Sequence, residues 1–271
     1  MVNGFTPVKE IEYPDGLISH IPLNVLKEYN LKVVKSGNVI EVYSYDKKVY
    51  YNYDPLNREF NQKEKTKEWD GKSLDSLRRS RREIRRLIWC NFGRHSKFLT
   101  LTYKDNMQDL EKFYYDWKMF IKSMSRKGIF LKYLYVLEYQ ERGAIHAHVI
   151  IFNTEYIPVE KIEDSWPHGF VKINSIKEIK NLGAYVCKYL TKETLSEYNS
   201  KSYHCSRGLN RPIERKITLE ESANLMQELL SKGEVVYTSK YDMSVNDIVT
   251  NKVEYSQIKV QHFNNKSVTN V

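Results

Sequence analysis

Cysteine is scarce in this chain, and long apolar runs are missing. Its 271 residues include three cysteines, Cys90, Cys187 and Cys205. This odd and widely spaced set argues against a disulfide framework and for a reducing cytoplasm. No apolar stretch reaches the length that spans a bilayer, and the first residues have no signal-peptide pattern, so we expect a cytoplasmic protein that does not cross a membrane. A Gly-x4-Gly-Lys-Ser/Thr sequence is also missing, which argues against a P-loop helicase domain.

Positive charge is abundant instead. The chain has 43 Lys and Arg against 34 Asp and Glu, a net charge of +9, which suits a polyanionic partner such as nucleic acid. Its length allows a sizeable hydrophobic core. We expect three parts, namely an N-terminal extension of unknown role over residues 1–70, a core led by a basic helix over 71–212, and a C-terminal extension with a polar tail over 213–271.

A pair of histidines stands in the most informative stretch. Residues 134–139 and 145–152 are rich in β-branched and aromatic side chains and predict a hairpin with a loop over 140–144. Because residues two apart in a strand share a face, His146 and His148 point the same way, and Glu138 on the partner strand lands opposite one of them. Two imidazoles and one carboxylate supply half of a coordination sphere for a divalent cation. The His-x-His pair alone is a weak signal, because seven histidines produce one by chance in roughly one shuffled chain in five.

A strongly basic helix is predicted over residues 73–92, where apolar side chains form a broken stripe. Six arginines occupy most of the remaining positions, and their guanidinium groups suit phosphate oxygens. They are Arg78, Arg79, Arg81, Arg82, Arg85 and Arg86. The alternative is a merely solvated helix face.

The remaining patterns alternate between strands and helices. A strand over 97–103 precedes an amphipathic helix capped by Asp105 and Asn106, whose apolar stripe runs from Met107 to Met124. After the hairpin, the patterns predict a linking segment over 159–166, a turn at 167–169, a strand over 170–176 and a helix over 179–192. This order predicts an α+β fold in which helices flank one central antiparallel sheet. Outside it, they predict a hairpin over 39–53 that turns at 46–48, a helix over 219–231, a strand over 234–241 and a loose tail from 251.

Two tyrosines lie four residues apart in the last helix of the predicted core. Tyr185 and Tyr189 are expected on one helical face, with Lys188 and Lys192 in the adjacent row. A nearby ammonium stabilises a phenolate and neutralises phosphate, so such a tyrosine can act as a nucleophile. The spacing alone is not specific, because residues 237–241 repeat the Tyr-x-x-Lys-Tyr pattern in a stretch that is typical of sheet surface.

Taken together, three motifs resemble those of the HUH endonucleases, the rolling-circle replication initiators of small plasmids and single-stranded DNA phages. They are Phe98-Leu-Thr-Leu-Thr-Tyr103, then Glu138 with His146-Ala-His148, then Tyr185-Val-Cys-Lys-Tyr189. The presence of two tyrosines in the third motif is similar to the phage branch of that family. The likeness covers residues 72–212. Ala147 departs from the bulky apolar residue usual between the two histidines, without moving the imidazoles.

The resemblance implies a fold, a reaction and a set of partners. The fold is an RRM-like palm sheet, and Glu138, His146 and His148 bind Mg²⁺ or Mn²⁺. Tyr185 or Tyr189, assisted by Lys188 and Lys192, attacks origin DNA that is single-stranded or melted. The attack forms a 5′-phosphotyrosine link and frees a 3′-OH primer, and later rejoining needs no ATP. The implied DNA contacts come from the six arginines together with Thr100 and Thr102. A host helicase and polymerase are further expected partners, in a bacterial cytoplasm if the gene belongs to a phage or plasmid, and no membrane is expected.

Other interpretations stay open. A two-tyrosine transposase or a relaxase shares this chemistry, although relaxases usually place the histidine motif after the tyrosine. A non-catalytic RRM-like module has the same sheet, charge and aromatic content but needs no Glu–His–His set, so metal-dependent nicking distinguishes it. A histidine-triad hydrolase would need a third alternating histidine where Ile150 stands.

Overall fold

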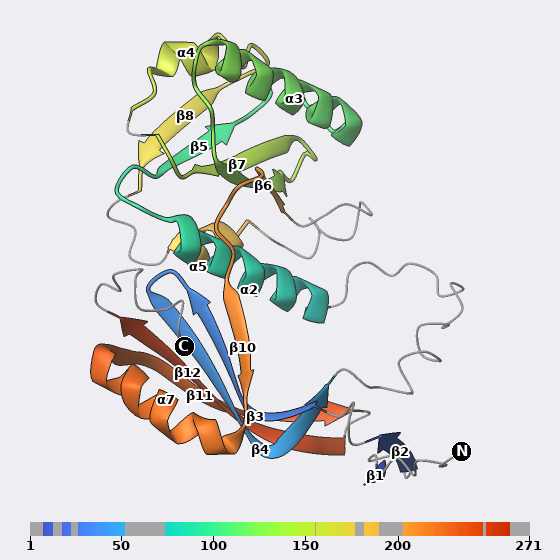
Figure 1. Cartoon of the computed structure of the whole chain (residues 1–271). Helices are drawn as coiled ribbons and strands as arrows, with labels where there is room; N and C mark the ends of the chain where they lie inside the picture. Colours follow the sequence, from blue (N-terminus) through green and yellow to red (C-terminus); the bar gives the residue numbers. More distant parts are fainter. Residues whose placement is uncertain are drawn as a thin grey trace, which may run out of the picture. The chain divides into compact units, whose positions relative to one another are not determined.

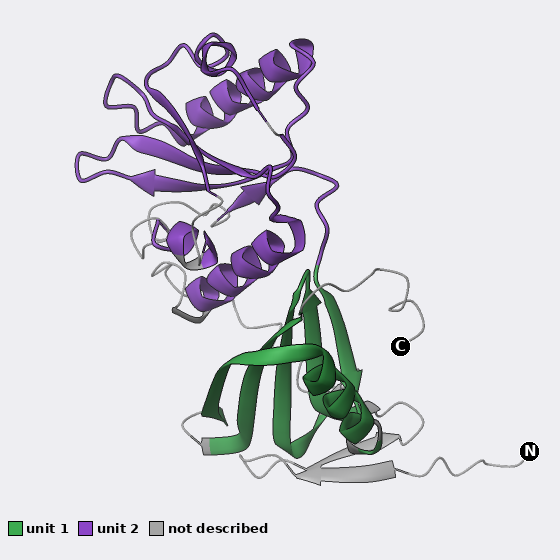
Figure 2. Cartoon of the chain, turned by 90° about the vertical axis from the view of Figure 1, so that its left-hand side faces the viewer, with its two compact units in different colours: residues 1–67, 212–271 green, residues 68–211 purple. Residues whose placement is uncertain are grey.

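The chain divides into two compact units. The computed structural model describes residues 8–12, 18–22, 27–51, 74–154, 156–176, 182–189, 203–245 and 248–260. Residues 68–211 form one unit, and residues 1–67 form the other together with residues 212–271 (Figure 2). The two ends of the chain, which were predicted as separate extensions, therefore contribute to the same unit.

The unit of residues 68–211 is built on a five-stranded antiparallel sheet in the order β8-β5-β7-β6-β9 (Figure 1). The strands are β5 (Lys97–Leu101), β6 (Tyr133–Tyr139), β7 (Ile145–Ile151), β8 (Val171–Ser175) and β9 (His204–Cys205). With α3 (Leu110–Arg126) after β5 and α4 (Val159–Glu163) after β7, the first four strands follow the split βαβ arrangement of ferredoxin-like folds. The predicted α+β class is confirmed.

Helices cover both faces of this sheet. On one face, α3 and α4 enclose a core that includes Phe113, Trp117, Phe120 and Ile162. On the other face, α2 (Leu74–Asn91) and α5 (Leu182–Cys187) pack over Phe98, Val136 and Ile150. Alternation along each strand therefore sends half of its side chains to each core. The face under α2 and α5, which carries Glu138, His146 and His148, is called the site face below.

One expectation about the α3 side is wrong. The helix begins at Leu110, and its N-cap is Asp109, whose carboxylate accepts a bond from Lys112 N, rather than Asp105 or Asn106. Met107 is buried in the same core but lies in the segment before the helix, and its carbonyl accepts a bond from Ile145 N at 2.9 Å. The linking segment over 159–166, for which the predicted order allowed a helix or a turn, contains the helix α4.

Helix α5 ends earlier than predicted. Within the described residues 182–189, α5 ends at Cys187, and a turn follows in which Tyr189 N donates to Val186 O. Tyr185 is therefore helical, whereas Tyr189 lies just past the helix. The rest of the predicted helix, including Lys192, falls outside the described residues.

The other unit contains a second five-stranded antiparallel sheet, in the order β10-β3-β4-β12-β11. Its strands are β3 (Lys27–Ser36), β4 (Val39–Tyr51), β10 (Ile213–Ile217), β11 (Gly233–Val245) and β12 (Ile248–Val260). Helix α7 (Leu219–Lys232) packs its Leu229 against Leu31, Val42 and Ile258 of this sheet. Strands β1 (Val8–Glu12) and β2 (Ile18–Pro22) pair separately.

Two predictions for this unit are also wrong. The chain does not turn at residues 46–48: β4 runs through them, and the turn lies at Gly37, whose φ of 61° suits glycine. The segment from Asn251, predicted as a loose tail, forms most of β12, an interior strand that pairs with both β4 and β11. None of the helices within the described residues has the length and apolar character needed to cross a membrane.

Candidate active site

The β6–β7 hairpin brings the predicted metal ligands to one end of the site face. Its loop closes through bonds from Gln140 N to Ala144 O and from Gly143 N to Gln140 O, and the φ of 84° at Gly143 requires a residue without a side chain. The resulting register places Glu138 opposite His146 and leaves His148 diagonal to it. The hairpin therefore fixes which residues share the face.

Glu138 and His148 are in direct contact. The Nε2 atom of His148 lies 2.7 Å from Oε2 of Glu138 and donates to this carboxylate. The other ring nitrogen, Nδ1, is buried and has no hydrogen-bond partner among the described residues. Burial lowers the pKa of His148, and the adjacent carboxylate opposes that shift only in part. The imidazole is therefore held toward its neutral form, which is the form that ligates metals.

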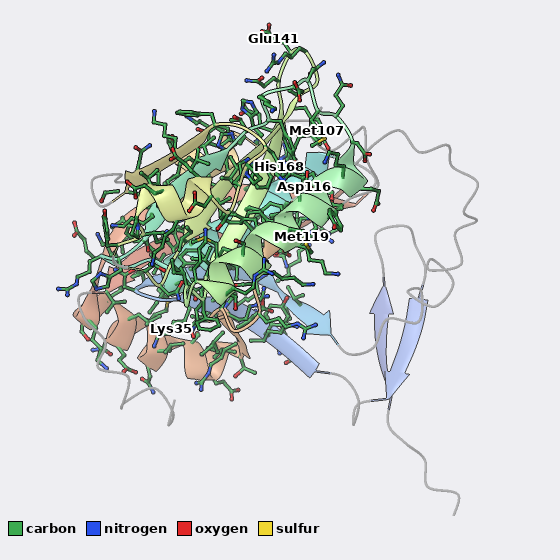
Figure 3. All side chains as sticks on the ribbon, turned by 90° about the horizontal axis from the view of Figure 1, so that it is seen from above. Lys35, Met107, Asp116, Met119, Glu141 and His168 are labelled. Atoms are coloured by element: carbon green, nitrogen blue, oxygen red, sulfur yellow. The ribbon has the colours of Figure 1, made fainter. Side chains whose placement is uncertain are left out.

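His146 is less tightly placed than His148. It is half-buried opposite Glu138, and burial lowers its pKa while Glu138 acts in the opposite direction. Within the described parts of the chain, no three His, Cys, Asp or Glu side chains are grouped as a metal-binding cluster. The structure thus joins two of the three predicted ligands and leaves the third beside them. Glu141, the other acid nearby, lies at the outer tip of the loop (Figure 3).

The spacing of the donor atoms suits a divalent cation. Two ligands at right angles on Mg²⁺, each about 2.1 Å from the ion, stand about 3 Å apart. The Glu138 and His148 donor atoms are 2.7 Å apart, close to that spacing, so an ion about 2.1 Å from each would lie beside the line that joins them and would replace the shared proton. The residues fit a divalent ion, with a proton now bridging the two donors.

The two tyrosines meet the histidine in an aromatic cluster. The rings of His148 and Tyr189 stack with centroids 3.6 Å apart, and Tyr189 Oη donates to Tyr185 Oη at 3.2 Å. Phe98 lies beneath, 5.2 Å from the Tyr185 ring and 5.8 Å from the His148 ring. No role was predicted for Phe98, although its alternation with Thr100 puts it on the face of His148. Tyr189, bonded to Tyr185, therefore lies directly on the imidazole that contacts Glu138.

Charge around the tyrosines acts in two directions. Burial raises the pKa of Tyr189, and the hydrogen bond to Tyr185 and the negative charge of Glu138 raise it further. Positive charge comes from Lys188, whose Nζ lies 4.1 Å from the Tyr185 ring centroid and 4.8 Å from that of Tyr189. An ammonium group at this place is suited to neutralise a phosphate.

The arginines of α2 divide into two sets. An open pocket of about 450 Å³ lies between α2 and α5 and is lined by Arg78, Arg81, Arg82, Arg85, Cys187 and Lys188. We call this pocket the arginine groove. Arg79 and Arg86 lie outside it. Lys188 belongs to both the groove and the tyrosine pair, so a phosphate chain in the groove reaches the tyrosines directly.

The groove depends on a close approach of the two helices. A Cβ added at Gly183 of α5 would lie 2.7 Å from Cγ of Arg85, so glycine lets the arginine stem lie against α5. Sulfur Sγ of Cys187 donates to Arg81 O at 3.5 Å, and burial raises the pKa of this thiol. No pattern in the sequence indicates this use of Gly183 or Cys187.

The two threonines of the first motif differ in their surroundings. Thr100 lies directly opposite His148 in the β5–β7 register and is partly exposed. The hydroxyl of Thr102 is already used, because it donates to Phe170 O at 3.3 Å and accepts from Phe170 N at 3.1 Å. Thr100 therefore remains available to a ligand on the site face, whereas Thr102 anchors the loop before β8.

Comparison with known proteins gives one match. Residues 96–194 match a family of replication-associated proteins, described as the ORF2 type. The matched segment begins just before β5 and includes the hairpin, both tyrosines and Lys188. It supports assignment to a replication initiator family and a role in DNA replication. No curated protein and no solved structure matched in the other two comparisons.

Proposed function

We propose that the chain is a DNA endonuclease and strand transferase that initiates replication by nicking single-stranded or locally melted origin DNA. The observation that carries the proposal is the contact of the tyrosine pair with His148, which is itself bonded to Glu138. A nucleophile pair and a cation site next to each other are what a tyrosine-mediated phosphodiester transfer needs.

Three residues would hold the cation, namely Glu138, His146 and His148. The match to a replication-associated family supports a phosphodiester substrate. A bound Mg²⁺ or Mn²⁺ supplies charge that polarises the non-bridging oxygens of the scissile phosphate. The arginine groove and Lys188 hold the strand through its phosphates, and Thr100 lies across from His148 to bond the same strand.

In the chemical step, the hydroxyl oxygen of Tyr185 or Tyr189 forms a bond to phosphorus as the bond to the 3′ oxygen breaks. The tyrosine proton is lost and the leaving 3′ oxygen gains one, so the products are a 5′-phosphotyrosine and a free 3′-OH. Lys188 stabilises the phenolate that develops. The number of phosphodiester-type bonds is unchanged, so neither nicking nor rejoining needs ATP. The second hydroxyl, 3.2 Å away, is positioned for the next transfer.

The test is a covalent adduct. The full chain is incubated with single-stranded origin oligonucleotides and Mn²⁺, and a protein–DNA species that survives denaturation is measured, with EDTA as the control. We expect an adduct that EDTA prevents, and mass spectrometry should place it on Tyr185 or Tyr189. Tight DNA binding with no adduct under any of these conditions would instead favour the RRM-like binding module, which has the same sheet and charge. An adduct on Tyr237 or Tyr241 would move the nucleophile to the other unit.

A further inference from the structure

The far edge of the site face carries an exposed aromatic ring. Strand β8 is the edge strand beside β5, with Leu101 opposite Val171 and Thr100 opposite Lys172. The ladder continues one residue further, because Thr102 N donates to Phe170 O at 3.0 Å. Phe170 therefore stands in line with the strand, at the end of the sheet where the β6–β7 loop lies.

Alternation decides which way these side chains point. Val171 is buried in the core on the α3 side of the sheet. Its neighbours Phe170 and Lys172 consequently face the other way, toward the side of Thr100 and His148. Phe170 is 65% exposed, and Lys172 is exposed as well. An aromatic ring and an ammonium group thus stand two residues apart on the open edge of the site face.

The backbone holds the ring in place. Thr102 bonds the backbone of Phe170 through both its own backbone and its hydroxyl. Gly169 packs so closely against the end of β5 that an added Cβ would lie 2.3 Å from Thr102 O. Because the backbone of Phe170 is already held in place, stacking of a flat group on its ring would cost the chain little further conformational entropy.

We infer that Phe170 and Lys172 form a nucleotide subsite for single-stranded DNA, in which Phe170 stacks on an unpaired base and Lys172 neutralises an adjacent phosphate. The inference rests on the proposed function and extends the strand path beyond the cation site. Strands in a sheet are spaced by about 4.8 Å, so Lys172, two strands from His148, stands about 10 Å from it, one or two nucleotides along an extended strand. Stacking on an aromatic ring beside a cation is how single strands are held without reading sequence.

The test compares Phe170→Ala with Phe130→Ala. Phe130 is 72% exposed and lies before β6, at the opposite end of the sheet. Phe130→Ala therefore removes a similarly exposed ring at a distance from the proposed subsite. Binding to a single-stranded oligonucleotide is measured in the full chain without metal, so that no cleavage occurs. We expect Phe170→Ala to raise Kd by about 5- to 150-fold and Phe130→Ala to leave it unchanged. Phe170→Trp should restore binding, and binding to a blunt duplex should not respond to Phe170→Ala.

Lys172→Gln provides a second, independent readout. It should flatten the dependence of log Kobs on log[salt] by about 0.7, as the loss of one single-strand phosphate contact does, whereas Phe170→Ala should leave that slope unchanged. Equal Kd values for wild type and Phe170→Ala on single strands overturn the subsite, as does equal weakening by Phe130→Ala.

Adduct formation separates this inference from the proposed function. If wild type forms the Mn²⁺-dependent adduct while Phe170→Ala binds single strands normally, the nicking function stands and the subsite is wrong. If wild type forms no adduct but Phe170→Ala weakens single-strand binding selectively, the subsite stands and the nicking function is wrong.

Discussion

The arginine groove offers a sharp test of DNA binding because α2 carries its own control. Arg78 and Arg82 line the groove, whereas Arg79 and Arg86 share a neighbouring face of the same helix, seven residues apart. Replacing either pair with Gln removes two positive charges from one helix. If the arginines act only through net charge, both double variants should lose the same DNA affinity. If the groove holds the strand, only the Arg78→Gln/Arg82→Gln variant should lose affinity.

The expected size follows from counterion release. Each phosphate contact on a single strand contributes about 0.7 to the slope of log Kobs against log[salt]. Loss of both groove contacts should flatten the slope by about 1.4, which corresponds to roughly a 25-fold weaker Kd at 0.1 M salt. The Arg79→Gln/Arg86→Gln variant should keep the wild-type slope.

The assay is fluorescence anisotropy with a labelled oligonucleotide over a salt series, on chains whose thermal unfolding matches wild type. Several unrelated oligonucleotide sequences should lose affinity alike, since phosphate contacts carry no sequence information. Equal flattening by both double variants, or a loss limited to one sequence with an unchanged slope, would refute the assignment of the groove.

Three further predictions concern the site and its support. Tyr185→Phe and Tyr189→Phe should each retain some single-turnover nicking of an oligonucleotide, and the double variant none; full adduct yield from the double variant would contradict this. His146→Ala should abolish nicking at limiting Mn²⁺ while single-strand binding stays within about twofold, and wild-type rates at every Mn²⁺ concentration would remove His146 from the ligand set. Gly169→Ala should lower the free energy of unfolding by about 1–3 kcal/mol in urea titrations, because its Cβ would meet the Thr102 backbone, and an unchanged midpoint would contradict that contact.

Local periodicity predicted the parts of the site that depend on one or two strands. The hairpin, its loop and the shared face of His146 and His148 follow from alternation and from the glycine at the turn. The apolar stripe of α3 likewise identified its buried face. These features need only the sequence of a single element or of two consecutive ones.

Features that depend on distant pairing were missed. Strand β12 is mostly polar from Asn251 onward, and its place between β4 and β11 completes the burial of Val253 and Ile258. Asn251 also bonds both the amide and the carbonyl of Lys47, more than 200 residues away, which holds β4 extended where a turn was predicted. No window of sequence contains both partners of such a contact.

The tyrosine pair depends both on local spacing and on a contact with a distant residue. This decides how a variant at His148 should be interpreted. Spacing predicted that Tyr185 and Tyr189 lie close together, but it attributed this to a shared helical face, whereas α5 ends before Tyr189. Tyr189 is held by stacking on His148 at 3.6 Å and by its bond to Tyr185. His148→Ala therefore removes a proposed metal ligand and the ring that supports a nucleophile. We expect excess Mn²⁺ to rescue His146→Ala in part and to leave His148→Ala inactive. Equal rescue of the two variants in adduct assays over a Mn²⁺ series would show that stacking on His148 does not position Tyr189 for attack.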